Sequence, residues 1–129
     1  MSNSTELARR AVEAVGQRDL DRFLALMAED VRIQPQLAEN GYEGHPGALR
    51  WWENLVGGIP DLSLEIVDVR ELGDDLVVAA VRTRGKGSAT IVPFEYTFWV
   101  AARWQQGKCV WFGAFLSERD ALEAAGLSA

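Results

Sequence analysis

Few residues in this sequence combine a chemically useful type with a setting that suits chemistry. Glu95 is the one carboxylate of nineteen that lies in an aromatic strand pattern, between Phe94 and Tyr96. The other carboxylates fall on predicted helix surfaces, in turns or on polar strand positions, where solvated charges belong. If Glu95 faces an apolar interior, its carboxyl group becomes a candidate proton donor or acceptor. The more apolar alternation runs through Tyr96 and Phe98 and favours instead a position for Glu95 at an outward rim or a dimer edge.

Tyr96 and His45 complete the set of candidate catalytic groups. An inward Tyr96 hydroxyl has two roles open to it, a hydrogen bond to a ligand carbonyl or to a backbone group. His45 is the single histidine and precedes Pro46 at a predicted helix start. That position favours a surface residue at the helix N-terminus, with a proton shuttle at a pocket mouth as the functional alternative.

The composition excludes several other classes of function. With one Cys and one His, the chain has neither an internal disulfide nor a Cys/His zinc site, and we expect no metal and no cofactor. A net charge of −6 disfavours nucleic acid and anionic membranes as partners. The first residues have no basic region followed by an apolar stretch, so we expect no secretion signal, and no apolar run approaches the roughly 20 residues that cross a bilayer. The lone Cys109 fits a cytoplasmic location, and its role stays open.

Helices that would position these groups are predicted mainly in the first half of the chain. Apolar residues recur every three or four positions over residues 7–15 and 20–27, and Asp19 is a good cap between the two helices. Residues 31–35 alternate as a short strand, and residues 47–56 form a third helix that ends at two glycines.

The second half changes to the two-residue period of strands. Strands are predicted at about 62–70, 76–83, 91–104 and 109–116, with turns between them. The alternation changes phase after Ile66, which predicts a bulge. Ser117 with Asp120 predicts the capped start of a short final helix that Gly126 ends.

Helices followed by hairpin-linked strands predict an α+β fold, with residues 1–129 as one domain built on a curved antiparallel sheet. The strand over residues 94–102 is apolar on both faces, so both faces need cover. We expect a second copy of the chain to cover the outer face, which makes a homodimer.

The residues also resemble a known family, the SnoaL-like group of the nuclear transport factor two superfamily, which includes ketosteroid isomerases. The resemblance spans nearly the whole chain and rests on Gln17-Arg-Asp-Leu-Asp21, Gly41-Tyr-Glu-Gly-His-Pro-Gly-Ala-Leu-Arg-Trp-Trp52, the hairpin Arg84-Gly-Lys-Gly-Ser88, Gly107-Lys108 and Arg119-Asp-Ala-Leu-Glu-Ala-Ala-Gly-Leu127. It implies a cone in which three helices of the N-terminal half pack on the concave face of the sheet, a pocket between them, and commonly a homodimer through the convex face.

The residues that the family uses for chemistry are missing from the matching positions. The general base of isomerase-like members falls on Gln34 or Pro35, and their oxyanion donors fall on Ala11 and on Trp99 or Val100. An amide cannot take a proton near neutral pH, so base catalysis from Gln34 is lost. The last strand lacks the Asp of the cyclases, and Arg82 lacks the two Asp partners of the epoxide hydrolases.

We therefore expect a pocket for a small, mostly apolar molecule. Its expected lining is Gln34, Trp52, Phe98, Trp99 and Phe112, and the face of the long strand that contributes is open between Glu95/Thr97/Trp99 and Tyr96/Phe98/Val100. Two functions are open: an isomerase, cyclase or epoxide hydrolase with a non-standard polar set, or a catalytically silent ligand-binding or dimerisation module.

Overall fold

A computed structural model of the protein describes residues 4–34, 41–59, 61–73, 75–85 and 93–126. Pro35, the predicted turn after Gly85 and the first two residues of the predicted strand 91–104 lie outside the described residues. The helices are α1 (Ser4–Gly16), α2 (Leu20–Ala25), α3 (Gly44–Leu55) and α4 (Glu118–Ala124). The strands are β1 (Met27–Gln34), β2 (Tyr42–Glu43), β3 (Ser63–Leu72), β4 (Leu76–Gly85), β5 (Phe94–Gln105) and β6 (Lys108–Phe115).

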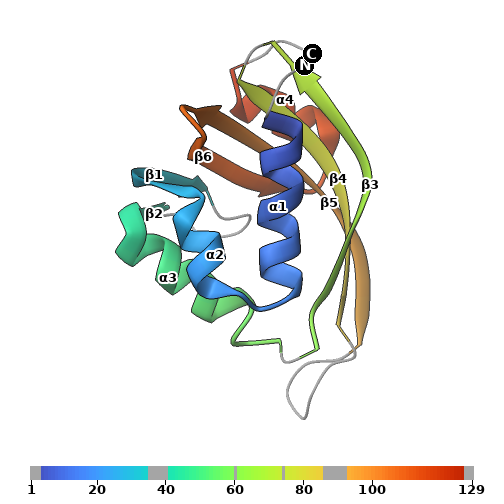
Figure 1. The fold of residues 1–129 in the computed structure, drawn as a ribbon. Coiled ribbons are helices and arrows are strands. Elements are labelled where there is room, and N and C mark those ends of the chain that lie inside the picture. Colours follow the sequence, from blue (N-terminus) through green and yellow to red (C-terminus); the bar gives the residue numbers. More distant parts are fainter. Residues whose placement is uncertain (1–3, 35–40, 60, 74, 86–92, 127–129) are drawn as a thin grey trace.

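The strands form one curved sheet in the order β2-β1-β6-β5-β4-β3 (Figure 1). Neighbouring strands are antiparallel except for β1 and β6, which are parallel. The α+β class with a curved, mostly antiparallel sheet is therefore confirmed.

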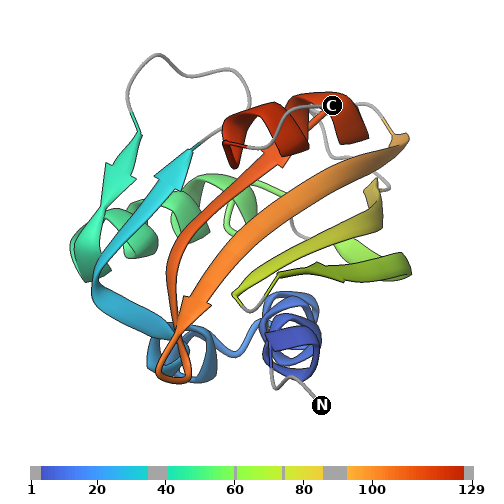
Figure 2. The same ribbon diagram turned by 90° about the horizontal axis from the view of Figure 1, so that it is seen from above.

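Helices lie on both faces of this sheet. The first three helices cover the concave face, as expected, and α4 lies on the opposite face (Figure 2). Alternation along the strands separates two apolar clusters: Val77 and Ala102 belong to the core under α1–α3, whereas Val78 and Ala101 pack with α4. The cone-like arrangement predicted by the resemblance is thus present.

The position of α4 corrects one step of the sequence argument. A second copy of the chain was expected to cover the outer face. Ala121 of α4 and Ala125, which follows the helix, are buried in one cluster with Leu76, Val78 and Phe115 on that face. Part of the apolar surface there is therefore covered within one chain.

The predicted caps and bulge are present. The Asp19 side chain accepts a hydrogen bond from the Arg22 N–H at 3.1 Å, and the Ser117 Oγ accepts one from the Asp120 N–H at 3.1 Å. The pairing of β3 with β4 shifts register between Ile66 and Asp68, where the alternation changed phase. The two caps and the bulge are each marked by residues close together in the chain, which explains why they could be predicted from the sequence.

Strand β1 begins earlier than predicted, because hydrogen bonds from distant residues hold its first residues extended. The Cys109 N–H donates to the Leu26 carbonyl at 2.8 Å, and Met27 pairs with Cys109 in the parallel ladder. Met27 was expected in the second helix, which instead ends at Ala25. The two-residue strand β2 was missed because it is too short for an alternation to show.

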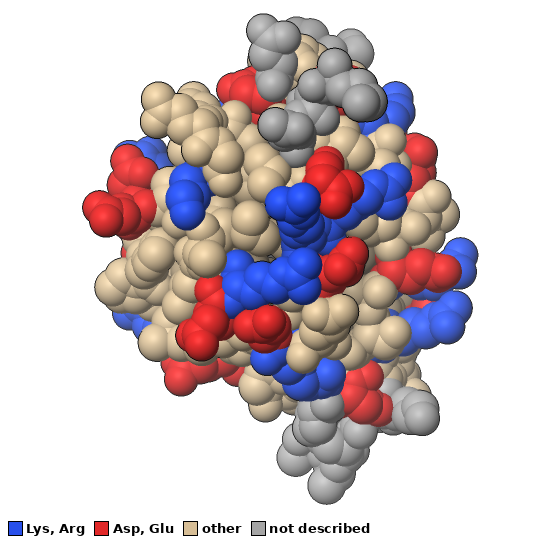
Figure 3. All heavy atoms as spheres, in the orientation of Figure 1, with Lys and Arg blue, Asp and Glu red and all other residues tan. Residues whose placement is uncertain are grey.

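No helix within the described ranges is long and apolar enough to cross a membrane. On the face seen in Figure 3, basic and acidic side chains lie among one another without a large patch of one sign.

Candidate functional site

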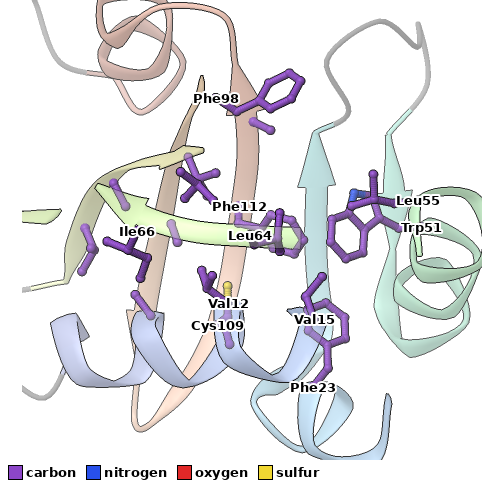
Figure 4. A pocket seen from close by; sticks show the side chains of 18 of the residues that line it. Val12, Val15, Phe23, Trp51, Leu55, Leu64, Ile66, Phe98, Cys109 and Phe112 are labelled. Atoms are coloured by element: carbon purple, nitrogen blue, oxygen red, sulfur yellow. The ribbon is translucent and has the colours of Figure 1, made fainter. Parts of the chain in front are cut away.

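A cavity of about 270 Å³ lies between the concave face of the sheet and the first three helices. Side chains from α1, α2, α3 and from strands β1, β3, β4, β5 and β6 line it (Figure 4). Folded interiors normally contain few voids larger than a water molecule. The sequence makes space here with small residues that face one another across the fold, namely Ala8, Ala11, Ala79, Ala102 and Ala114.

Aromatic rings from three elements form one wall of the cavity. Trp51 of α3 stacks on Phe23 of α2 with ring centroids 5.3 Å apart, and it meets the ring of Phe112 from β6 edge-on at 5.1 Å. Such packed pairs contribute about 0.5–1.5 kcal/mol each beyond their buried area. The rings of this wall are therefore packed on one another without a ligand.

Trp51, rather than its neighbour Trp52, contributes to this wall. Trp52 is buried behind it, with its ring 5.2 Å from that of Phe23. Trp51 and Leu55 both line the cavity and are four residues apart, about one helical turn. This spacing was the signal in the sequence that could have identified Trp51 as the cavity residue.

The long strand β5 presents its even-numbered residues to the cavity. Phe98 and Val100 line it, whereas Trp99 lies on the other face, against the cluster under α4. Of the expected ligand-binding residues, the structure thus places Gln34, Phe98 and Phe112 at the cavity and places Trp52 and Trp99 away from it.

The polar content of the wall is small. Gln34 is exposed and lies at the end of β1, so that it sits at the edge of the cavity. Thr83 is buried, and its hydroxyl donates to the Val81 carbonyl at 3.4 Å. Among the described residues of the wall there is no Asp, Glu, His, Lys or Arg.

Cys109 brings a thiol to the wall. Burial raises the pKa of this thiol to about 12, while its hydrogen bond to the Trp111 carbonyl at 3.4 Å acts in the opposite direction. The nucleophilic form of cysteine is the thiolate, so a thiol that stays neutral at physiological pH is inert. Cys109 therefore acts here as a small apolar residue.

Trp104, at the far end of β5, also lines the cavity. The residue is 5% exposed, and its indole N–H has no hydrogen-bond acceptor among the described residues. The sequence analysis did not single out Trp104, although its even position in β5, shared with Phe98 and Val100, was a signal for the cavity.

The three candidate catalytic residues lie outside the wall. Glu95 is on the outer face, more than half exposed, in an ion pair with Arg84. Tyr96 is 44% exposed, and its ring contacts that of Phe98 at a centroid distance of 5.0 Å. The structure therefore does not bring Glu95 or Tyr96 to the cavity, and it places Glu95 at the exposed rim.

His45 connects α3 to β1. Its Nε2 lies 2.9 Å from the Met27 carbonyl oxygen, which can only accept, so Nε2 carries the proton. The side chain is partly buried and does not line the cavity. This contact holds the start of α3 against β1. The single histidine of the sequence is therefore absent from the cavity lining.

No part of the described chain gathers three or more His, Cys, Asp or Glu residues in a way that would hold a metal ion. The wall is instead suited to contacts with apolar surface, with hydrogen bonding restricted to a few places.

Comparisons with known proteins give one family and many similar folds. The SnoaL-like domain family matches residues 8–112. A comparison with curated proteins finds no match. Among solved structures, RV0760c from Mycobacterium tuberculosis in complex with estradiol-17β-hemisuccinate is 15% identical, with a TM-score of 0.79 and coverage of 94% of this chain and 98% of that one.

Two further structures are similar over nearly their whole length. A loop-truncated variant of IdmH is 25% identical, with a TM-score of 0.73 and coverage of 94% of this chain and 97% of that one. SalBIII, an epoxide hydrolase/cyclase-like enzyme with a role in pyran ring formation in the polyether salinomycin, is 13% identical, with a TM-score of 0.79 and coverage of 92% and 93%. These similarities show that the chain shares its fold with these proteins.

Proposed function

The chain belongs to the SnoaL-like domain family, and we propose that it binds a small, mostly apolar molecule in the cavity between the sheet and α1–α3 without acid–base catalysis. The lining carries this proposal. Beyond apolar side chains it contains Gln34 at the edge, a Thr83 hydroxyl already bonded to backbone, the neutral Cys109 thiol and two indoles. Ligand pockets typically combine such an apolar lining with a few polar groups that fix orientation.

The size and shape of the cavity support the same proposal. Its volume of about 270 Å³ lies just below the range of about 300–1,000 Å³ common for small-molecule sites, which suits a small ligand. A charged group placed among these side chains would lose its hydration without a partner, at a cost of several kcal/mol or more. The ligand is therefore uncharged over the part that enters the cavity.

The competing proposal is an enzyme of the isomerase, cyclase or epoxide hydrolase type. Proton transfer requires a titratable group within hydrogen-bond reach of the reacting atom. The family resemblance puts such groups at Ala11, at Gln34 or Pro35, and at Trp99 or Val100. Of these residues, Ala11, Gln34 and Val100 line the cavity, and none of the five has a side chain that titrates. The lining thus favours binding, and we propose no metal or cofactor for it.

A binding experiment with product analysis separates the two proposals. Estradiol, an uncharged relative of the steroid ester held by RV0760c, is titrated into the protein while tryptophan fluorescence is followed, because Trp51 and Trp104 line the cavity. We expect saturable one-to-one binding and, by mass spectrometry after long incubation, recovery of unchanged estradiol.

The same titration with phenanthrene tests whether apolar surface alone suffices. If neither molecule binds up to its solubility limit, the proposed function is wrong. If estradiol or another bound molecule is recovered chemically altered at a rate proportional to protein concentration, the enzyme proposal replaces it.

A further inference from the structure

A groove of about 460 Å³ adjoins the cavity, between α1 and the start of β3. Val12, Leu64 and Ile66 line both the groove and the cavity. These three side chains come from α1 and β3, the two elements that flank both hollows (Figure 4), and each is only partly buried. A molecule in the cavity therefore has to pass only this one layer of side chains to reach the groove.

The groove has the polar side chains that the cavity lacks. Arg9, Glu13 and Gln17 line it at intervals of four residues, the spacing that places side chains on one helix face, and Ser63 lines it from β3. All four residues are exposed, so a charged group in the groove keeps part of its contact with water. A ligand that extends from the cavity into the groove therefore passes from apolar to polar surroundings.

The charges around the groove favour an anion. The Glu13 carboxylate lies 4.0 Å from the guanidinium of Arg22 on α2, which offsets its charge, and the same guanidinium donates to the Gln17 side-chain oxygen at 3.4 Å. The Arg9 side chain forms no ion pair or hydrogen bond with any described residue, although Glu13 is one helical turn away. Arg9 therefore offers a guanidinium whose donors are all unused, and the planar guanidinium matches a carboxylate with two parallel hydrogen bonds.

We propose that the ligand is an amphipathic carboxylate, with its apolar body in the cavity and its carboxylate group in the groove beside Arg9. This inference rests on the proposed function. It adds the chemical class of the ligand, the direction in which it lies and the residue that selects its charged end. The carboxylate stays out of the cavity, where it would have no polar partner.

Paired ligands and paired variants test the inference. Dodecanoate and dodecan-1-ol have the same alkyl chain and differ only in whether the end group is charged. R9Q removes the positive charge from the groove and keeps a polar side chain there. R10Q makes the same change at the next residue, which is exposed, pairs with Glu6 and lies outside both hollows.

Followed by tryptophan fluorescence, R9Q should bind dodecanoate roughly three- to fivefold more weakly than the wild type, as loss of an exposed ion pair implies. The affinity of R9Q for dodecan-1-ol should be unchanged, and R10Q should bind both ligands like the wild type. Dodecanoate should also displace estradiol, because its chain occupies the cavity. Equal weakening of both ligands in R9Q, or the same loss of dodecanoate affinity in R10Q, would overturn the inference.

A variant on the opposite wall of the groove gives a gain instead of a loss. S63K adds a positive charge from β3 and should strengthen dodecanoate binding while leaving dodecan-1-ol unchanged, and damage to the fold cannot produce such a gain. Unchanged dodecanoate affinity in S63K would contradict the proposal.

The failure of the inference is distinguishable from that of the proposed function. If estradiol binds but dodecanoate does not, or if dodecanoate binds without displacing estradiol, the inference alone is wrong. If estradiol, dodecanoate and dodecan-1-ol all fail to bind, the proposed function itself is wrong.

Discussion

Phe98 and Trp99 are neighbours on strand β5, and their side chains lie on opposite faces of the sheet. Phe98 lines the cavity, and Trp99 packs against the apolar cluster that contains Ala121 of α4 and Ala125, the residue that follows the helix. Two large aromatic residues side by side in the sequence therefore serve two different parts of the molecule, one the candidate site and the other the attachment of the C-terminal helix.

We therefore expect substitutions on the two faces to differ in effect, with a change at Trp99 lowering mainly the stability of the fold and a change at Phe98 lowering mainly the affinity for a ligand. Trp99→Ala should lower the free energy of unfolding by about 2 kcal/mol, less than the 3–5 kcal/mol typical of a fully buried Trp, because Trp99 is only partly buried. It should leave estradiol affinity unchanged. Phe98→Ala should have the opposite balance, with weaker binding and a smaller loss of stability. Urea denaturation and the fluorescence titration measure the two effects, and equal losses of binding in both variants would contradict the assignment of faces.

Cys109 predicts a specific dependence of stability on alkaline pH. The thiol pKa is raised from 9.0 to about 12 in the folded protein by burial. Between these values the folded state keeps a proton that the unfolded state has released, so the free energy of unfolding falls as pH rises, by up to about 1.4 kcal/mol per unit. Below pH 9 this contribution is fully present.

Cys109→Ala isolates this effect. Between pH 9 and 11, the stability of C109A should fall less steeply than that of the wild type, since other titrating groups are common to both. V100A removes cavity-lining atoms without removing a titrating group, and it should retain the wild-type slope. Identical slopes for C109A and the wild type would show that the thiol ionises freely in the folded protein.

Steroid isomerisation should be absent. The matching positions, Ala11, Gln34 or Pro35, and Trp99 or Val100, offer no general base and no acidic donor. A positioned acid or base typically contributes about 100- to 10,000-fold. A β,γ-unsaturated ketosteroid incubated with the protein should isomerise at the rate of buffer alone, as followed by ultraviolet absorbance of the conjugated product. Turnover well above that background would show that a proton-transferring group reaches the cavity.

Self-association through the outer face of the sheet remains a prediction from the sequence. Helix α4 covers the centre of that face, while Trp99 and Trp111 stay partly exposed beside it and Leu116 is 45% exposed. Sedimentation at micromolar concentration should give a species of twice the 14.2 kDa chain mass. A single species with the mass of one chain would reject the homodimer. It would also show that α4 covers enough of the outer face of the sheet for the monomer to be stable in solution.

The sequence predicted what local patterns encode and missed what distant contacts decide. The Asp19 and Ser117 caps and the bulge after Ile66 depend on a few adjacent residues, and all are present. The first residues of β1 were misassigned because their partners are distant in sequence: Met27 pairs with Cys109 on β6, and its carbonyl accepts a hydrogen bond from His45.

The site was predicted less well than the fold for a related reason. The alternation on β5 indicated that Phe98 faces inward, but the same alternation continues to Trp104, whose place at the cavity was overlooked. Glu95 attracted attention through its aromatic neighbours, yet its cross-strand partner is Arg84, and the ion pair between them satisfies the charge at the surface. Partners across a sheet are set by register, which no single strand reveals.

The most direct test of a ligand-binding cavity is to fill it. Ala11→Phe places a ring in the cavity from α1, and Arg10→Phe adds the same ring one residue away at an exposed site outside the wall. With both variants folded by circular dichroism, A11F should lose at least tenfold in estradiol affinity, and R10F should bind like the wild type. Undiminished estradiol binding by A11F would contradict the account, because the molecule would then bind elsewhere.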